Sequence, residues 1–197
     1  MISGSVIRSF VLLLIFACFV VPTARAAEVE KLMAAMAAVK HRVVSYKEEK
    51  QMEMLEESLH SEGRLEYIAP DKLIRSVMKP VEMRYIIDSR QLIIDKGGKL
   101  QVRSLENLPL VRVFVESFRS VLAGDLDTLN KYYSITFSGD PPAWKLILQP
   151  KDKKLAVYVK KLELSGTGDD VQLYVVEDSN GDLTRMQLYP FDSKVNE

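Results

Sequence analysis

Apolar side chains recur at helical spacing near the start of the chain and again in its middle. In residues 29–43 they lie three and four positions apart on an alanine-rich background, and the same spacing returns in residues 110–122. Gly124 and Asp125 then supply a helix end and the cap of a second, short helix that runs through Tyr132. The pattern predicts one amphipathic N-terminal helix and two helices in the middle of the chain.

Between and after these segments the period of the pattern changes to two. Residues 44–105 alternate apolar and polar side chains, and Gly97 with Gly98 marks a hairpin turn because glycine reaches positive φ without steric cost. This alternation is typical of an antiparallel meander. Five further strands are predicted in the C-terminal part, at residues 133–137, 144–149, 155–164, 171–177 and 183–189.

The order of these elements is helix, strands, helices, strands, with no internal repeat or linker to divide them. The two runs of strands most economically form one large, curved antiparallel sheet with the helices packed in its concavity, an α+β fold that is mainly β. A sheet of about ten strands curls as its twist accumulates. We therefore expect an apolar hollow that the helices fill only in part.

The first 26 residues have the layout of an export signal. Arg8 precedes the apolar run of residues 10–21, and small residues at 24 and 26 suit cleavage before Ala27. The run is too short for a membrane span, which needs about 20 residues. The sequence therefore predicts a cleaved signal peptide, residues 1–26, and a single exported domain, residues 27–197.

An alternative interpretation makes residues 15–18 a lipobox with Cys18 as an acylated N-terminus. Phe16 is bulky for that motif and the apolar run continues past Cys18, so the cleavable signal is favoured. Because Cys18 is the only cysteine, the exported domain has no disulfide, thiolate nucleophile or cysteine metal site.

The charge balance narrows the class of partner. The chain has 27 basic and 27 acidic side chains, and loss of Arg8 and Arg25 leaves the exported domain with a formal charge of −2. This near-neutral balance lacks the positive field that nucleic-acid binders use, so we expect no nucleic-acid partner.

Candidate catalytic and metal-binding residues are few. His41, expected at the end of the first helix, and His60, expected to face solvent on a strand, have no second histidine or carboxylate cluster at metal-ligand spacing. The paired acids at 48–49 and 56–57 are interpreted as solvated strand faces and ends and not as an acid/base pair. We expect no enzyme, no metal and no cofactor.

Two further motifs are explained by local structure. Residues 178–182 have the oxygen spacing of a calcium loop, but Leu183 replaces the expected glycine, and a hairpin turn accounts for the same residues. Ser76 and Lys79 match the S-x-x-K motif without its companion motifs, so this match is ascribed to chance.

Two segments together carry a resemblance to a known family. Residues 62–73, EGRLEYIAPDKL, and residues 144–150, WKLILQP, within this order of elements, resemble the LolA-type periplasmic lipoprotein carriers. The resemblance implies an unclosed antiparallel half-barrel with a helical lid over an apolar cavity. It also implies an acylated lipoprotein or lipid as cargo, an inner-membrane loading complex, an outer-membrane receptor and a monomeric, periplasmic protein.

One position departs from the family pattern. Typical carriers have an arginine directly before the proline of the first segment, where it pins the lid, and this chain has Ala69 before Pro70. Arg64 and Arg75 lie nearby, but strand alternation gives no reason to assign the role to either. The sequence is similar to a divergent branch of the family.

The predicted cavity lining consists of apolar residues on alternating strand faces or on the central helix. A one-residue error of register would exchange the whole set for the opposite face. The main alternative function is an envelope sensor or interaction module with the same fold. A second alternative is a hydrolase of a hydrophobic substrate that uses His41, His60 or the strand acids. The predicted lining is Leu65, Tyr67, Leu73, Met83, Tyr85, Ile87, Phe114, Phe118, Trp144, Leu146 and Leu148.

Overall fold

The computed structural model describes residues 21–139 and 142–191. Most of the predicted signal peptide, with Cys18, lies outside the described residues. The helices are α2 (Val21–Ala38), α3 (Pro109–Leu122), α4 (Leu126–Tyr132) and α5 (Lys153–Ala156), with a 3₁₀ turn η1 (Leu105–Asn107). The strands are β1 (His41–Gln51), β2 (Leu59–Ile68), β3 (Lys72–Lys79), β4 (Met83–Asp88), β5 (Gln91–Lys96), β6 (Lys99–Ser104), β7 (Tyr133–Ser138), β8 (Ala143–Pro150), β9 (Val159–Thr167), β10 (Asp170–Asp178) and β11 (Leu183–Pro190).

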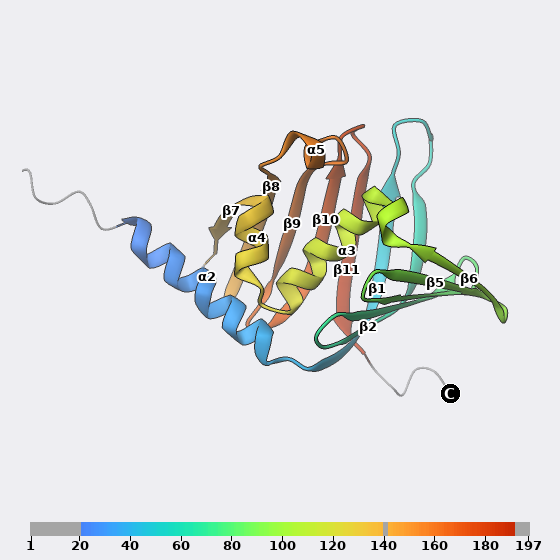
Figure 1. Cartoon of the computed structure of the whole chain (residues 1–197), viewed down its shortest axis with the longest axis horizontal. Coiled ribbons are helices and arrows are strands. Elements are labelled where there is room, and N and C mark those ends of the chain that lie inside the picture. Colours follow the sequence, from blue (N-terminus) through green and yellow to red (C-terminus); the bar gives the residue numbers. More distant parts are fainter. Residues whose placement is uncertain (1–20, 140–141, 192–197) are drawn as a thin grey trace, which may run out of the picture.

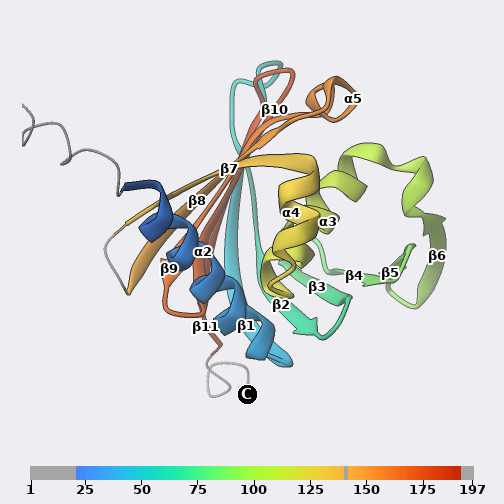
Figure 2. The same cartoon turned by 60° about the vertical axis from the view of Figure 1, so that its left-hand side comes forward.

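In the described part of the chain, all eleven strands belong to one antiparallel sheet. Their order is β6-β5-β4-β3-β2-β1-β11-β10-β9-β8-β7, so the two strand runs are joined where β1 pairs with β11. Figure 1 shows the long strands of the C-terminal half, and Figure 2 shows how β2 to β6 curve away from them around the helices. The predicted fold class, a large curved sheet that stays unclosed, is confirmed.

α2, α3 and α4 lie against the concave side of this sheet, whereas α5 lies at the strand ends in the connection between β8 and β9 (Figure 2). α3 ends at Leu122, and Gly124 follows two residues later with a φ of 66°, the left-handed conformation that glycine adopts most easily. The Asp125 carboxylate then accepts a hydrogen bond from the Thr128 amide and caps α4. Both helix signals predicted for this segment are confirmed.

Alternation along the strands decides which side chains enter the core. Trp144, Leu146 and Leu148 of β8 are at most 5% exposed and lie on the same face as Leu162 and Leu164 of β9. The intervening side chains of both strands face away from the helices. Burial of each of these four leucines contributes about 1.5–3 kcal/mol to the stability of the fold.

Two predicted boundaries are wrong. The first helix ends at Ala38, and His41, expected at its end, is instead the first residue of β1, where its Nε2 lies 2.9 Å from Glu66 Oε1. The helical spacing up to residue 43 is overridden because β1 pairs along most of its length with both β2 and β11. His60 is exposed on β2, as predicted.

Residues 155–158, predicted as the start of a strand, form part of a helical turn. The Asp152 carboxylate accepts a hydrogen bond from the Lys154 amide and caps α5, and the strand begins only at Val159. Side-chain capping of the backbone competes with strand pairing at this position.

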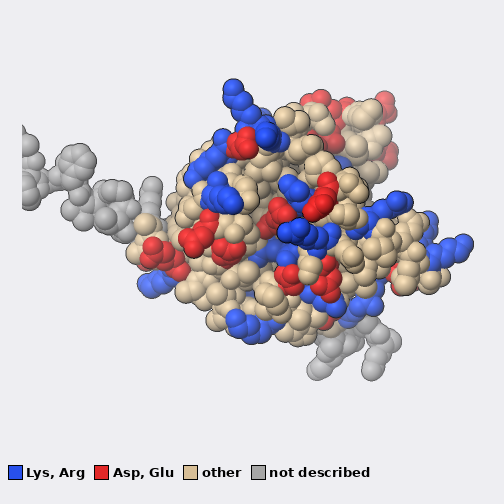
Figure 3. Space-filling model, viewed as in Figure 1, with Lys and Arg blue, Asp and Glu red and all other residues tan. Residues whose placement is uncertain are grey.

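Charged side chains of both signs are interspersed over the face drawn in Figure 3. Within residues 21–139 and 142–191, none of the helices combines the length and the apolar character needed to cross a bilayer.

Candidate functional site

A cavity of about 560 Å³ lies between the N-terminal half of α3 and the curved half of the sheet; we call it the α3 cavity. Its size is within the range of pockets that enclose small ligands. Its walls come from β1 to β5, α3 and the β10–β11 hairpin. The lining residues are Glu48, Lys50, Ser61, Arg75, Val77, Pro80, Val81, Met83, Tyr85, Ile87, Leu92, Leu110, Val111, Phe114, Val115, Val176, Asp178, Asp182 and Thr184.

The cavity borders the first turns of α3, where the helix is least buried, although Val113 and Val115 are already buried. Near its C-terminal end, Phe118 and Val121 are 5% and 0% exposed, whereas Leu110 in the first turn is 42% exposed. Val111 and Phe114 are half-buried between these extremes. The helix thus leaves an apolar space beneath its first turns, opposite β3 to β5.

The predicted lining residues fall into three groups. Four line the α3 cavity, four line a second cavity of only about 30 Å³ near the ends of α2 and α3, and three are packed in the core on the same face of the sheet. In that order the groups are Met83, Tyr85, Ile87 and Phe114; Leu65, Tyr67, Leu73 and Phe118; and Trp144, Leu146 and Leu148. That any of them contacts a ligand stays a prediction.

One wall of the α3 cavity is polar, and Arg75 is at its centre. Its Nη2 donates to Glu48 Oε1 at 2.7 Å and to Ser61 Oγ at 3.0 Å, and its Nε donates to the Tyr46 hydroxyl at 3.0 Å. The guanidinium carbon also lies 4.8 Å from the centre of the Tyr46 ring. We call Tyr46, Glu48, Ser61 and Arg75 the polar wall.

Strand register explains how Arg75 reaches β1 from β3. Arg75 pairs with Leu65 of β2 and Glu48 pairs with Ser61, so Gly63, midway between Leu65 and Ser61, lies on the diagonal from Arg75 to Glu48. Because Gly63 has no side chain, the long arginine can cross β2 at this point. A larger side chain at this position of β2 would stand between Arg75 and its partners on β1.

The pKa values of Arg75 and Tyr46 are both shifted in the polar wall. Burial disfavours the charged form of Arg75, but Glu48 and Tyr46 outweigh this effect, so the pKa of Arg75 is raised. Burial also raises the pKa of Tyr46. The prediction of solvated strand acids is therefore wrong for Glu48, whose side chain is 14% exposed because it faces the concave side, where it pairs with Arg75.

The polar wall could have been found from the alternation itself. Leu73 was predicted to face the cavity, and a period of two places Arg75 and Val77 on the same face of β3. Ser61 likewise shares a face with Leu65 on β2. A charged side chain at an inward position is unusual, and it becomes intelligible only once its buried partner on another strand is known.

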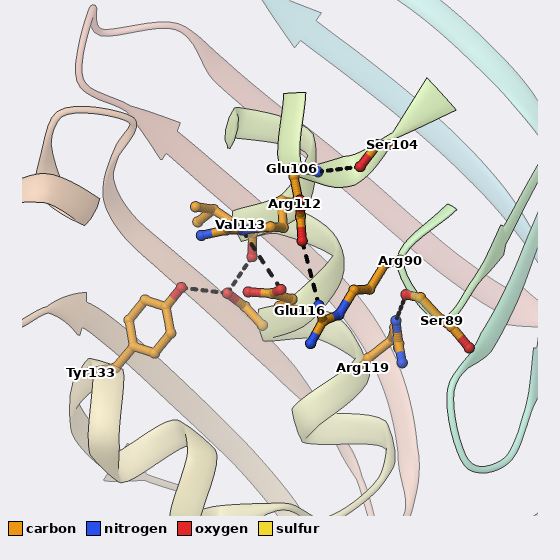
Figure 4. Close-up of polar contacts among 10 residues, drawn as sticks. Ser89, Arg90, Ser104, Glu106, Arg112, Val113, Glu116, Arg119 and Tyr133 are labelled. Atoms are coloured by element: carbon orange, nitrogen blue, oxygen red, sulfur yellow. Dashed lines mark hydrogen bonds and ion pairs between the residues drawn. The ribbon is translucent and has the colours of Figure 1, made fainter. Parts of the chain in front are cut away.

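Arg119 attaches α3 to the rim of the half-barrel. Its Nη2 lies 3.2 Å from Asp71 Oδ2, and its Nη1 donates to the Ser89 carbonyl at 3.0 Å, a contact seen in Figure 4. Asp71 directly follows Pro70, and the residue before that proline is Ala69, the position at which the family pattern has an arginine. In this chain the turn is thus joined to the helix by a cation on the helix. Arg64 instead lies over the Phe191 ring.

An aromatic cluster packs behind Phe114, which lines the α3 cavity. The Tyr174 ring packs edge-on against Phe114, with centroids 4.9 Å apart, and lies 5.0 Å from Phe118. Tyr133 nearby has its hydroxyl 2.5 Å from Ser117 Oγ, whereas the buried Tyr174 hydroxyl has no hydrogen-bond partner among the described residues. Burial raises the pKa of Tyr174 well above its ordinary value.

Replacing Tyr174 with phenylalanine is expected to leave the free energy of unfolding unchanged or to raise it by up to about 1 kcal/mol, because the hydroxyl is buried without a partner. Tyr133→Phe, which removes a hydrogen-bonded hydroxyl, is expected to lower it by about 1 kcal/mol. Urea unfolding of both variants checks this pair. A larger loss for Tyr174→Phe than for Tyr133→Phe would contradict it.

Metal-binding groups are not gathered in the described residues, where no three His, Cys, Asp or Glu side chains lie close enough to hold an ion. The calcium-like segment is the turn between β10 and β11. There, Asp178 Oδ1 accepts hydrogen bonds from the Asn180 and Asp182 amides. This confirms the interpretation of the segment as a hairpin turn.

The unclosed, curved sheet and the helix-covered cavity define the class: a half-barrel of the LolA type. The family profile described as "Outer membrane lipoprotein carrier protein LolA-like" matches residues 21–190, and the chain belongs to this family. A comparison of the sequence with curated proteins found no match.

Several solved structures are similar to this chain at low sequence identity. A DUF1329 family protein from Desulfovibrio piger is 10% identical, with a TM-score of 0.51 over 87% of this chain and 94% of that chain. A LolA superfamily protein from Nitrosomonas europaea is 11% identical, with a TM-score of 0.43 over 85% and 94%. A chain of the MucA/MucB complex of Pseudomonas aeruginosa is 12% identical, with a TM-score of 0.47 over 86% of this chain and 61% of that chain. At these identities the likeness concerns the fold.

Proposed function

We propose that residues 27–197, after removal of the signal peptide, form a non-enzymatic periplasmic carrier. The carrier holds the acyl chains of a lipoprotein or related acylated lipid in the α3 cavity and delivers them towards the outer membrane. The observation that supports this function is the α3 cavity itself, whose wall on β3 to β5 and α3 is almost entirely apolar. Membership of the lipoprotein-carrier family agrees with it.

The energetics favour an acyl chain as the occupant. Each buried CH₂ contributes about 0.8 kcal/mol, so about a dozen methylenes would contribute on the order of 10 kcal/mol before the cost of ordering the chain. Met83 and Phe114 at the cavity surface suit such a ligand, since a flexible thioether and an aromatic face adapt to a mobile chain. Release would require a partner or a movement of α3, whose first turn is the least buried part of the helix.

The cargo can be tested on protein purified without detergent from the periplasm of its own host. Native mass spectrometry with organic extraction is expected to reveal a co-purifying acylated species and, from the intact mass, a chain that begins at Ala27. An empty protein that also fails to take up acyl probes would exclude the carrier function. A stable protein partner in place of lipid would favour the interaction module.

Filling the cavity is expected to block uptake of an apolar probe. Val111 is half-buried on α3 and lines the α3 cavity, so the indole of Val111→Trp would occupy the space of the ligand. We expect the affinity for the neutral fluorescent probe N-phenyl-1-naphthylamine to fall by about tenfold or more. Fluorescence titration of the wild-type chain and the variant measures this change.

Val157→Trp is the matched control, because Val157 is 63% exposed, follows α5 and does not line the α3 cavity. Its affinity for the probe is expected to equal that of the wild-type chain. Equal affinities in all three proteins would show that the probe binds elsewhere and would remove the support for this cavity as the cargo site.

A further inference from the structure

The polar wall keeps hydrogen-bonding capacity that the protein does not use. Nε and Nη2 of Arg75 are engaged by Tyr46, Glu48 and Ser61, whereas Nη1 has no partner among the described residues. Nη1 carries two N–H donors. The Arg75 side chain is 25% exposed and lines the α3 cavity, so a ligand in the cavity can reach these donors.

The charge around Arg75 is already compensated. Glu48 neutralises the guanidinium at 2.7 Å, and the cavity lining as a whole has three carboxylates, Glu48, Asp178 and Asp182, against two cations, Lys50 and Arg75. An anionic group brought to Nη1 would be desolvated next to Glu48 and in a site with an excess of negative charge. Both effects oppose its binding.

A cationic group is no partner for Nη1 either, because an ammonium group has no lone pair with which to accept a hydrogen bond, and each lining carboxylate already accepts from at least one donor of the protein. Glu48 accepts from Arg75 and Ser61, Asp178 accepts from two amides of its own turn, and Asp182 accepts from the Glu53 amide. The lining cation Lys50 adds repulsion. What the wall can bind without a charge penalty is an uncharged acceptor.

We propose that the polar wall binds the uncharged carbonyl of an acyl ester or amide and discriminates against free fatty-acid carboxylates and anionic phospholipids. The carbonyl oxygen would accept from Arg75 Nη1 while the attached chain extends along the apolar wall towards Phe114. This inference rests on the proposed function and specifies its ligand class. In this proposal Arg75 binds the carbonyl group of the ligand, and Glu48 lowers the affinity of the site for anions.

Three probes with the same chain test the proposal: monoolein with a neutral ester, oleate with a carboxylate and oleylamine with an ammonium group. The affinity of each lipid is measured by its displacement of N-phenyl-1-naphthylamine from the protein. The pH is kept above the pKa of the fatty acid, and each lipid is kept below the concentration at which it aggregates. We expect monoolein to bind about tenfold tighter than oleate and tighter than oleylamine.

The decisive variant is Glu48→Gln, which keeps the shape of the side chain but leaves the Arg75 charge uncompensated. It is expected to raise the affinity for oleate by about tenfold and to reduce or reverse the preference for monoolein. Glu163→Gln is the matched control, because it breaks a different ion pair of the sheet, between Glu163 and Lys145, away from the α3 cavity. It is expected to keep the wild-type preference.

The outcomes separate the two proposals. If the wild-type chain binds neither the fluorescent probe nor any of the three lipids, the carrier function fails. If it binds them without preferring the ester, or if Glu48→Gln gains no affinity for oleate, the carrier function stands and the head-group inference is overturned. Thermal melting of each variant shows whether it is folded; should Glu48→Gln not fold, the double variant Glu48→Met, Arg75→Met replaces it and must lose the ester preference.

Discussion

Replacing Gly63 with alanine is expected to lower the free energy of unfolding by about 3 kcal/mol or more. A Cβ at this position would lie 1.9 Å from the Ser76 carbonyl oxygen of the neighbouring strand, and backbone atoms cannot yield as a flexible side chain does. The register of β2 against β3 is irregular between Glu62 and Gly63, directly beside this close approach. Urea unfolding followed by circular dichroism measures the loss.

Gly97→Asn is the control for this variant. Gly97 lies in the β5–β6 turn with φ of 59°, a conformation that asparagine tolerates, and a Cβ at this position would have no other atom within 4 Å. Its free energy of unfolding is expected to stay within about 0.5 kcal/mol of the wild-type value. A small loss for Gly63→Ala, comparable to that of the control, would show that β2 and β3 can separate to admit the methyl group.

Replacing Arg75 alone with methionine is expected to lower the free energy of unfolding by about 2–3 kcal/mol. The variant leaves the 14%-exposed Glu48 carboxylate without its cation and removes the donor to the Tyr46 hydroxyl. Removing one member of a buried pair is costly because the remaining charge is desolvated without compensation. Chemical unfolding of the single variant gives the loss.

The double variant Arg75→Met, Glu48→Met tests whether this loss comes from the unpaired charge. With both charges gone, two apolar side chains extend the apolar lining of the α3 cavity, and stability is expected to return to within about 1 kcal/mol of the wild-type chain. An equal or larger loss in the double variant would instead mean that the pair holds β1 and β3 in register through its hydrogen bonds.

The helical and strand patterns predicted most of the fold because each reports a local periodicity. The Gly97–Gly98 turn, the end of α3 before Gly124 and the Asp125 cap of α4 lie where the sequence places them. The errors lie at boundaries. The helical spacing continues to residue 43, but α2 ends earlier because β1 pairs with β2 and β11, and these long-range pairings are not visible in a local pattern. α5 forms where a strand was predicted to begin because the Asp152 side chain caps a helical turn there.

The lining residues show where such reasoning stops. Met83, Tyr85 and Ile87 alternate on β4, so the pattern selects them together, and they do lie together in the α3 cavity. The same alternation selects Trp144, Leu146 and Leu148 on β8, which are packed in the core. Periodicity identifies the inward face of a strand, but whether a helix covers that face closely depends on where α3 crosses the sheet.

By itself, the sequence determined that the chain is one antiparallel, mainly β fold of the LolA-like family, which face of most strands is apolar, and where its turns and helix ends lie. These features depend on spacing and on the conformational limits of single residues. The tertiary structure alone decided which apolar faces border an open cavity, and that Arg75 crosses Gly63 to meet Glu48 and Tyr46 inside it. The reason is physical: a buried charge is tolerable only beside its partner, and that partner lies on a strand 27 residues away in the chain.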